Sequence, residues 1–376
     1  MNAYLSCVGC EQRELDAQRV LDYLKKNEIS ITSNPRTADY LFIITCGVDS
    51  SGEDRSILEI KSVAEQRKSG SRLIIGGCLP SISPNKILQF GADHIFSPRS
   101  IESLDNILEL DSRISHVIAP NRSIYDEPSQ EEYDPKSARE RFERAKRGYK
   151  VVVANGCLGT CSYCMIKEAT GRLQSKPVNE IIAQIKNGIN EQEPTIMLMA
   201  GDTGAYGQDI GTSFVELLDK TIQLEGNFRV YIHDFGIDWL IKDLEKYSEV
   251  FALAEEKQRV GGISIPLQSG SDNILRRMNR KYERKDAINA VRTIAHNSFD
   301  IGTHIMVGFP GESDHDFEDT IDLLQTAPFD FVTCFPYSEH PRASSASLDK
   351  KVPPEIIQKR LERISQLLRE RVKVMQ

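Results

Sequence analysis

Over the first 118 positions, short continuous runs of apolar residues alternate with segments in which apolar residues recur at helical spacing. Short apolar runs at 40–46 and 72–78 predict buried strands. Helical spacing recurs around them, over 15–29, 56–68 and 101–110. Strands that alternate with helices are typical of a small open sheet with parallel strands, so we predict an α/β domain over residues 1–118.

A second alternating run begins at residue 149. Six apolar stretches predict strands, and they lie at 149–155, 195–200, 228–233, 261–267, 300–308 and 329–335. Stretches with helical spacing separate these strands, and a long amphipathic helix with a Pro-rich start ends the chain. We therefore predict a partial (β/α)6 barrel with a C-terminal helix over residues 149–376.

The segment 119–148 between the two runs has a different composition. It is polar, charged and mostly aperiodic, which predicts a solvated linker.

Composition limits the class of protein. The chain has 376 residues, with 47 basic and 55 acidic side chains and a net charge of -8, which argues against a surface built as a whole to hold nucleic acid. We find no signal peptide and no apolar stretch long enough to span a bilayer, so we expect a cytoplasmic protein with no membrane partner. Eight cysteines in a reducing compartment favour metal binding or redox chemistry over disulfides.

Three of these cysteines, Cys157, Cys161 and Cys164, are spaced C-x3-C-x2-C on a Gly-containing loop. A disulfide set would leave an odd thiol, a structural zinc site normally has four protein ligands, and isolated buried cysteines rarely cluster in this way. An iron–sulfur cluster with one iron left open fits best, because three thiolates hold three irons and the fourth iron takes another ligand.

This motif, directly after the first barrel strand and with Tyr163 beside its last cysteine, resembles the signature of radical S-adenosylmethionine (SAM) enzymes. The resemblance implies that the open iron of a [4Fe–4S] cluster binds SAM. It also implies that the reduced cluster cleaves SAM to a 5′-deoxyadenosyl radical, which abstracts hydrogen from unactivated carbon.

Cysteines of the first domain narrow the resemblance. Cys46 and Cys78 each end a predicted strand, at the carboxyl edge where open α/β sheets place their sites. With Cys10, followed by Asp16, they resemble the ligands of a second [4Fe–4S] cluster in radical SAM methylthiotransferases, whose N-terminal domain is a flavodoxin-like parallel sheet. Cys7 is a rival to Cys10, and the offset to Asp16 favours Cys10.

The same resemblance implies further SAM-binding residues in the barrel. Asp202 takes the position of a group for the SAM amino nitrogen, and glycine at 308 would permit close approach to the adenine. Gln268 and Ser269 end the fourth strand. The full expected set is Tyr163, Gly201, Asp202, Gln268, Ser269, Gly308, Phe309, Pro310, Gly311 and Glu312.

Other features are open to a plainer interpretation. The loop 199–211 and the stretch 166–175 are nearest to the methylthiotransferases that modify N6-threonylcarbamoyladenosine in transfer RNA, but Thr170 stands where that branch has arginine. Cys334 is expected to pack inside a strand. A basic run is expected to be a solvated helix face, with contact to phosphates or to acidic substrate groups as the alternative. It comprises Arg276, Arg277, Arg280, Lys281, Arg284 and Lys285.

The family resemblance also implies a reaction. One SAM methylates the sulfur carried by the N-terminal cluster, and a second SAM yields the radical that opens a C–H bond to receive the methylthio group. An electron donor such as flavodoxin or ferredoxin is expected.

The substrate is left between two classes. No TRAM domain follows the barrel and the net charge is acidic, which favours a peptide or protein side chain over transfer RNA. A non-catalytic iron–sulfur carrier is the alternative from another class of protein. The Gly308–Glu312 stretch argues against it, because a carrier has no use for an adenine site.

Overall fold

The computed structural model describes residues 1–126, 136–295 and 299–374, and the chain forms two compact units. The first comprises Met1–Pro128 and Cys164–Arg172, and the second Ser129–Tyr163 and Leu173–Gln376. Within the described ranges, we find no helix whose length and apolar character would let it cross a bilayer.

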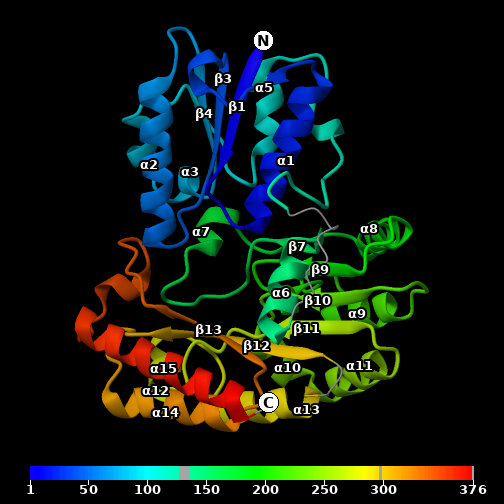
Figure 1. Cartoon of the computed structure of the whole chain (residues 1–376), viewed down its shortest axis with the longest axis vertical. Helices are drawn as coiled ribbons and strands as arrows, with labels where there is room; N and C mark the ends of the chain where they lie inside the picture. The colour runs from blue at the N-terminus through cyan, green and yellow to red at the C-terminus, as the bar shows by residue number, and fades with distance from the viewer. Residues whose placement is uncertain (127–135, 296–298, 375–376) are drawn as a thin grey trace. The chain divides into compact units, whose positions relative to one another are not determined.

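The first unit contains a five-stranded parallel sheet in the order β2-β1-β3-β4-β5, which is the flavodoxin-like order that we predicted (Figure 1). Its strands are β1 Asn2–Cys7, β2 Ser30–Ile31, β3 Tyr40–Thr45, β4 Arg72–Gly77 and β5 His94–Ile95. Strand β3 is buried on both faces, which explains its continuous apolar sequence. Strand β1 lies between β2 and β3 and was not expected, because NAYLSC has no continuous apolar run.

Helices cover both faces of this sheet. The α-helices of this unit are α1 Glu11–Lys26, α2 Ser50–Gln66, α3 Leu79–Ile82, α4 Pro84–Leu88, α5 Leu104–Leu108 and α7 Ile166–Thr170. Phe42 and Ile44 pack into the core on one face, and Leu41 and Ile43 into the core on the other.

The second unit contains a six-stranded parallel sheet in the order β13-β12-β11-β10-β9-β6. The first and last of these strands, β6 and β13, are at opposite edges, so the sheet is the partial (β/α)6 barrel that we predicted. Its strands are β6 Tyr149–Val152, β9 Thr195–Met199, β10 Arg229–Ile232, β11 Val260–Ser264, β12 Asp300–Val307 and β13 Phe331–Pro336. A short antiparallel pair joins β7 Ala154–Asn155 to β8 Gln174–Ser175.

Helices pack against one face of this sheet, where Ile196, Leu198, Val230 and Ile232 enter the main hydrophobic core. These helices are α8 Val178–Asn190, α9 Phe214–Ile222, α10 Ile237–Lys242, α11 Leu244–Glu256, α12 Asp272–Arg277, α13 Arg284–Ile294 and α14 Asp314–Thr326. The C-terminal helix α15, Pro354–Val374, packs against β12 and β13 (Figure 1).

A helix covers the opposite, inner face of the sheet, in the segment that we expected to be a solvated linker. Helix α6, Ala138–Lys146, begins at a capping box formed by Ser137 and Glu140. Its Phe142 packs with Tyr231 and Phe331. The expectation was wrong for this part of 119–148, because apolar side chains at positions 138, 142 and 145 give α6 one buried stripe. Residues 127–135 lie outside the described part.

Candidate functional site

Three thiols of the first unit lie at one edge of its sheet. Cys10 follows β1, Cys46 follows β3 and Cys78 follows β4, and these three strands are neighbours. Parallel strands end at the same edge, so the three loops are adjacent. Cys78 interacts electrostatically with both Cys10 and Cys46. The structure thus brings together the three residues predicted to hold the N-terminal cluster.

Arg13 on α1 supplies a buried positive charge beside these thiols. Its Nη1 donates to the Cys78 Sγ atom at 3.9 Å, and its Nε lies 3.1 Å from the Asp16 carboxylate. Burial raises the pKa of the Cys78 thiol to about 12, and Arg13 opposes that rise. The sequence analysis singled out Asp16 but missed Arg13, whose signal was its i,i+3 spacing to Asp16.

Cys7, the rival of Cys10, lies in a different environment. It packs against the core beside α1, together with Leu5. Its Sγ atom accepts a hydrogen bond from the Gly9 N–H at 3.4 Å, and burial raises the pKa of the thiol to about 12. Cys10 is solvent-exposed and is the N-cap residue of α1, whereas Cys7 is partly buried.

The second cysteine motif folds around Gly159. A Cβ atom added to Gly159 would lie 3.2 Å from the Cys157 Sγ atom and 3.8 Å from the Cys161 Sγ atom, so both sulfurs face this glycine. Cys164 starts the segment Cys164–Arg172 of the first unit, and its Sγ atom accepts a hydrogen bond from the Ile166 N–H at 3.5 Å. Within the described ranges, no group of three or more His, Cys, Asp or Glu side chains, including the two cysteine sets, is arranged closely enough to hold a metal ion.

The last residue of α12 and the two residues after it hold the cysteine loop in place. Ser162 donates its N–H to the Met278 carbonyl at 3.0 Å and its hydroxyl to the Arg277 carbonyl at 2.9 Å. The Asn279 amide donates to the Thr160 carbonyl at 2.7 Å. The loop is therefore built against a rigid support, as a pre-organised site requires.

Arg280 extends from the same support to the cysteine loop. Its Nη2 donates to the Tyr163 hydroxyl at 2.9 Å, and it interacts electrostatically with Cys161 and Asp202. We expected Arg280 to belong to a solvated helix face. Its position instead places a guanidinium beside the loop.

The rest of the basic run divides into two groups. Arg277 donates to the Pro310 carbonyl at 2.8 Å, and Arg284 pairs with Asp319 and Asp322. These two arginines, like Arg280, have partners within the second unit. The expected solvated face therefore holds only for the three exposed members, Arg276, Lys281 and Lys285.

Asp202 follows Gly201 at the end of β9, and both of its carboxylate oxygens have partners. Oδ1 accepts a hydrogen bond from the Gly236 N–H at 3.0 Å, and Oδ2 accepts one from the Trp239 indole at 2.9 Å. Burial raises the pKa of Asp202, and these two donors oppose the rise. The carboxylate is thus held in one orientation near Arg280.

Gln268 has the features of a ligand-binding side chain. It is only 6% exposed, and its Oε1 atom accepts no hydrogen bond from any residue that the structure describes. Its φ of 74° is in the left-handed region, which is costly for a residue other than glycine. Ser269 differs, because its hydroxyl accepts the Ser271 N–H at 3.2 Å and lies 3.5 Å from the Thr320 hydroxyl.

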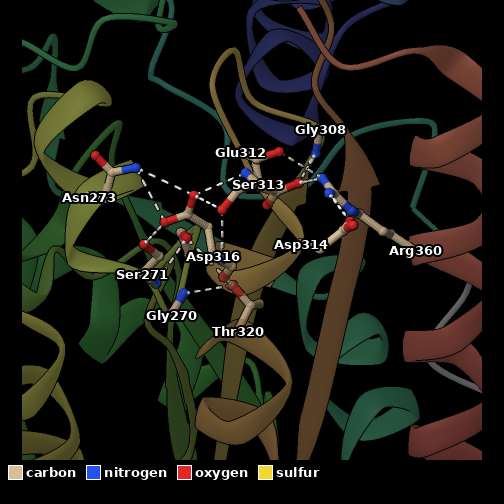
Figure 2. Close-up of polar contacts among 11 residues, drawn as sticks. Gly270, Ser271, Asn273, Gly308, Glu312, Ser313, Asp314, Asp316, Thr320 and Arg360 are labelled. Carbon is tan, nitrogen blue, oxygen red and sulfur yellow. Dashed lines mark hydrogen bonds and ion pairs between the residues drawn. The ribbon is translucent and has the colours of Figure 1, made fainter. Parts of the chain in front are cut away.

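The predicted turn Gly308–Glu312 is fixed by the C-terminal helix (Figure 2). The Glu312 carboxylate accepts hydrogen bonds from the Gly308 N–H and from Arg360 of α15, both at 2.7 Å, and Arg360 also pairs with Asp314. A Cβ atom at Gly308 would lie 2.4 Å from Ile357. In the structure this glycine permits the close approach of α15, and its contact with the SAM adenine stays a prediction.

The middle of the turn faces the cysteine loop. Phe309 is fully buried, and its ring meets the Tyr163 ring edge to face at 6.2 Å and the Tyr337 ring at 5.2 Å. The Pro310 carbonyl accepts the Arg277 hydrogen bond, and Gly311 has a φ of 91°.

A second polar network connects this turn to the loop after β11 (Figure 2). Asp316 accepts hydrogen bonds from the Ser271 hydroxyl at 2.5 Å, the Asn273 amide at 3.2 Å and the Ser313 hydroxyl at 2.6 Å. Burial would raise the pKa of Asp316, but these donors lower it. The network fixes the loop that carries Gln268 relative to the start of α14.

Comparison with known proteins finds matches to two protein families. Residues 151–324 match the Radical SAM superfamily, and residues 2–97 match a family described as Uncharacterized protein family UPF0004. A probable threonylcarbamoyladenosine tRNA methylthiotransferase of Methanocaldococcus jannaschii is 31% identical, over 98% of this chain and 83% of that protein. The ribosomal protein uS12 methylthiotransferase RimO of Carboxydothermus hydrogenoformans is 27% identical over the same shares.

Among solved structures, the radical S-adenosylmethionine methyltransferase TsrM of Kitasatospora setae has a TM-score of 0.64 to this chain. The match covers 92% of this chain and 77% of that one. The sequence identity is 12%, so this likeness concerns the fold alone.

The contacts of Arg360 generate a stability prediction. Replacement by methionine keeps the aliphatic stem but leaves the buried Glu312 carboxylate unpaired, so we expect Arg360→Met to lower the free energy of unfolding by about 3 kcal/mol. Urea unfolding followed by the fluorescence of Trp239, the single tryptophan, measures this change.

Arg363→Met is the matched control, because Arg363 pairs with Glu318 on the surface and its loss should cost less than about 1 kcal/mol. Adding Glu312→Gln to Arg360→Met should recover part of the stability. Equal effects of the two arginine variants would contradict the assignment.

Proposed function

The chain belongs to the radical SAM methylthiotransferase family, and we propose that it inserts a methylthio group at an unactivated C–H bond, using two [4Fe–4S] clusters and two molecules of SAM. The observation that carries this proposal is the meeting of Cys10, Cys46 and Cys78 at one sheet edge, in a chain that also contains the C-x3-C-x2-C motif.

The N-terminal thiols suit an iron–sulfur cluster. Three soft sulfur donors from three neighbouring strand ends leave one iron without a protein ligand. Arg13 offsets the negative charge of the thiolates, and Asp16 holds Arg13 in place. In this proposal the chain contributes the three ligands and a buried counter-charge.

The residues of the second unit suit SAM at the cluster of Cys157, Cys161 and Cys164. When bound, the clusters and SAM supply the radical and the methylthio group, which is chemistry that no side chain provides. Arg280 offers a partner for a carboxylate, and Asp202 offers one for an amino group. The unpartnered Gln268 Oε1 atom accepts a further N–H or O–H donor. A low-potential electron donor such as flavodoxin or ferredoxin completes the proposal.

For the substrate, we favour a peptide or protein side chain. The net charge of -8 opposes binding of a polyanion such as RNA, in which every nucleotide adds a negative charge. A relative that is named for modification of ribosomal protein uS12 supports a protein substrate in this family.

Transfer RNA is the second candidate. The loop 199–211 is nearest in sequence to the enzymes of N6-threonylcarbamoyladenosine, and the 31% identical relative from M. jannaschii is named for that reaction. In the structure this loop places Asp202 beside Trp239 and Gly236, within the second unit.

Two measurements test the proposal. Protein reconstituted with iron and sulfide should form 5′-deoxyadenosine from SAM in the presence of dithionite, and no product would remove the radical enzyme proposal. Mass spectrometry of a deletion strain should show loss of a methylthio mark from a peptide or protein. Loss of a methylthio nucleoside from bulk transfer RNA would instead establish the second candidate.

Cysteine variants distinguish the ligands of the N-terminal cluster. Reconstituted wild-type protein should bind about eight iron atoms, and Cys10→Ser should bind about four because a cluster loses one of its three ligands. Cys7→Ser serves as the matched variant and should retain about eight. Iron content and electron paramagnetic resonance measure both, and the reverse order would assign Cys7 as the ligand.

A variant of Arg280 tests the SAM site. Arg280→Gln removes the charge beside Tyr163 and should raise the SAM concentration for half-maximal 5′-deoxyadenosine formation by about tenfold, the loss of one charged hydrogen bond. Arg276→Gln changes an exposed member of the same basic run and should match wild type. If both variants behave as wild type, Arg280 does not contact SAM.

A further inference from the structure

Arg13 is a buried arginine beside the N-terminal thiols. It lies in the first turn of α1, three positions after Cys10, and it is 2% exposed. The N-terminal turn of a helix favours anions and the burial of a charge is costly, so an arginine at this position needs specific partners. Its Nη1 atom donates to the Cys78 Sγ atom at 3.9 Å, and its charge also interacts with Cys10. The partners of Arg13 are therefore two of the predicted cluster ligands.

The hydrogen bonds of Arg13 leave part of its guanidinium unused. Among the described residues, the guanidinium donates one hydrogen bond, and the acceptor is the Cys78 sulfur. Its Nε atom lies 3.1 Å from the Asp16 Oδ2 atom, yet it is a buried atom that forms no hydrogen bond within the described part. A guanidinium has five N–H groups, so most of its donors are available to a further acceptor.

Two neighbours restrict where Arg13 lies. A Cβ atom added to Gly9 would lie 2.2 Å from the Arg13 Cβ atom and 2.6 Å from its Cγ atom, so the missing side chain of Gly9 leaves room for this stem. Asp16, one turn further along α1, forms the ion pair with the guanidinium. The stem and the charge of Arg13 are thus both held near the thiols.

Two arginines interact with the thiols, and they differ in exposure. Arg13 acts on Cys10 and Cys78 from a buried position. Arg55 of α2 acts on Cys46, but its side chain is exposed. A charge is felt more strongly where water is excluded, and solvent screens an exposed one. Arg13 is therefore the arginine that we expect to have the larger effect on a cluster at these thiols.

A cluster at this site would gain a negative charge on reduction. Each thiolate of a [4Fe–4S] cluster binds a different iron, so the three sulfur atoms do not need to surround a single ion. The reduction potential of such a cluster depends on the net charge around it and on hydrogen bonds to its sulfur atoms. Arg13 supplies both a positive charge and a donor to the Cys78 sulfur, and each of them favours the reduced form.

We infer that Arg13 raises the reduction potential of the N-terminal cluster. The step is the transfer of one electron from the low-potential donor, which is oxidised, to the cluster, which is reduced, and no covalent bond forms or breaks. Arg13 stabilises the charge that this electron adds. Asp16 is a positioning residue, which holds Arg13 in place and partly neutralises it. The inference rests on the proposed function, because it needs a cluster at Cys10, Cys46 and Cys78.

The test isolates this cluster in the full-length chain. In the parent protein Cys157, Cys161 and Cys164 are all replaced by alanine, so that reconstitution with iron and sulfide loads only the N-terminal site. Titration with dithionite, followed by electron paramagnetic resonance of the reduced cluster, measures the midpoint potential. Iron content shows whether each variant holds the cluster.

Replacement of Arg13 should change this potential in a direction set by charge. We expect Arg13→Gln to shift the ratio of reduced to oxidised cluster about tenfold toward the oxidised form, which for one electron is a midpoint potential lower by about 59 mV. Arg13→Lys keeps the charge and should recover more than half of this shift. Arg55→Gln is the matched control, because it removes an exposed charge, and it should change the ratio by less than about twofold, or about 18 mV.

A substitution at Asp16 tests the same charge with the opposite sign. Asp16→Asn removes the negative charge beside Arg13 but keeps an oxygen for it, so the midpoint potential should rise above that of the parent. This variant leaves Arg13 itself unchanged, and it decides the question if Arg13→Gln does not hold the cluster.

The results that would overturn the inference differ from those that would overturn the proposed function. A potential of Arg13→Gln within about 18 mV of the parent, an equal shift in Arg55→Gln, or a potential of Asp16→Asn at or below that of the parent overturns the inference. A parent that binds no iron contradicts the N-terminal cluster of the proposed function. Wild-type protein that forms no 5′-deoxyadenosine from SAM contradicts the proposed radical chemistry.

Discussion

The candidate functional residues of this chain are brought together mainly because the strands of each large sheet are parallel. Both large sheets are wholly parallel, so every strand of a sheet ends at the same edge and the residues after it meet. The first sheet places Cys10, Cys46 and Cys78 together in this way. In the second sheet, Asp202 follows β9 and Asp234 follows β10. The remaining features of both units hold these strand-end residues in position.

Much of this arrangement is predictable from sequence. Apolar runs locate the buried strands β3 and β4, and the cysteines that follow them are then placed at a sheet edge without any coordinates. Strand β1 is less visible, because its sequence has no continuous apolar run although it lies inside the sheet. Helix α6 was missed for a related reason. Six of its nine residues are charged, and its buried stripe is short.

The partners of three arginines could not be predicted from the sequence. Arg13, Arg280 and Arg360 all stand in strongly charged stretches that read as solvated helix surface. Each instead contacts a segment that the sequence predicts to be functional, namely the N-terminal thiols, the cysteine loop and the turn Gly308–Glu312. A charged side chain leaves the solvent only where a partner satisfies it, and the partner here comes from a distant part of the chain. Arg360, for example, is 48 positions from Glu312.

The turn Gly308–Glu312 shows that a residue of a recognised sequence motif can also have a structural role inside the protein. Its residues are those of the predicted motif. In the structure, the Glu312 carboxylate accepts a hydrogen bond from the Gly308 N–H, and the missing side chain of Gly308 leaves space for Ile357. A buried carboxylate needs a cation, and a glycine beside a helix avoids a clash, so both residues have a structural role and their contact with SAM stays a prediction. A different kind of evidence for a ligand comes from a buried polar atom that has no hydrogen-bond partner within the described part of the protein. Gln268 has a buried side-chain oxygen that accepts no hydrogen bond from any residue in the described part. An unsatisfied buried oxygen therefore points to a ligand on physical grounds that do not depend on any motif, because a buried polar atom normally has a hydrogen-bond partner.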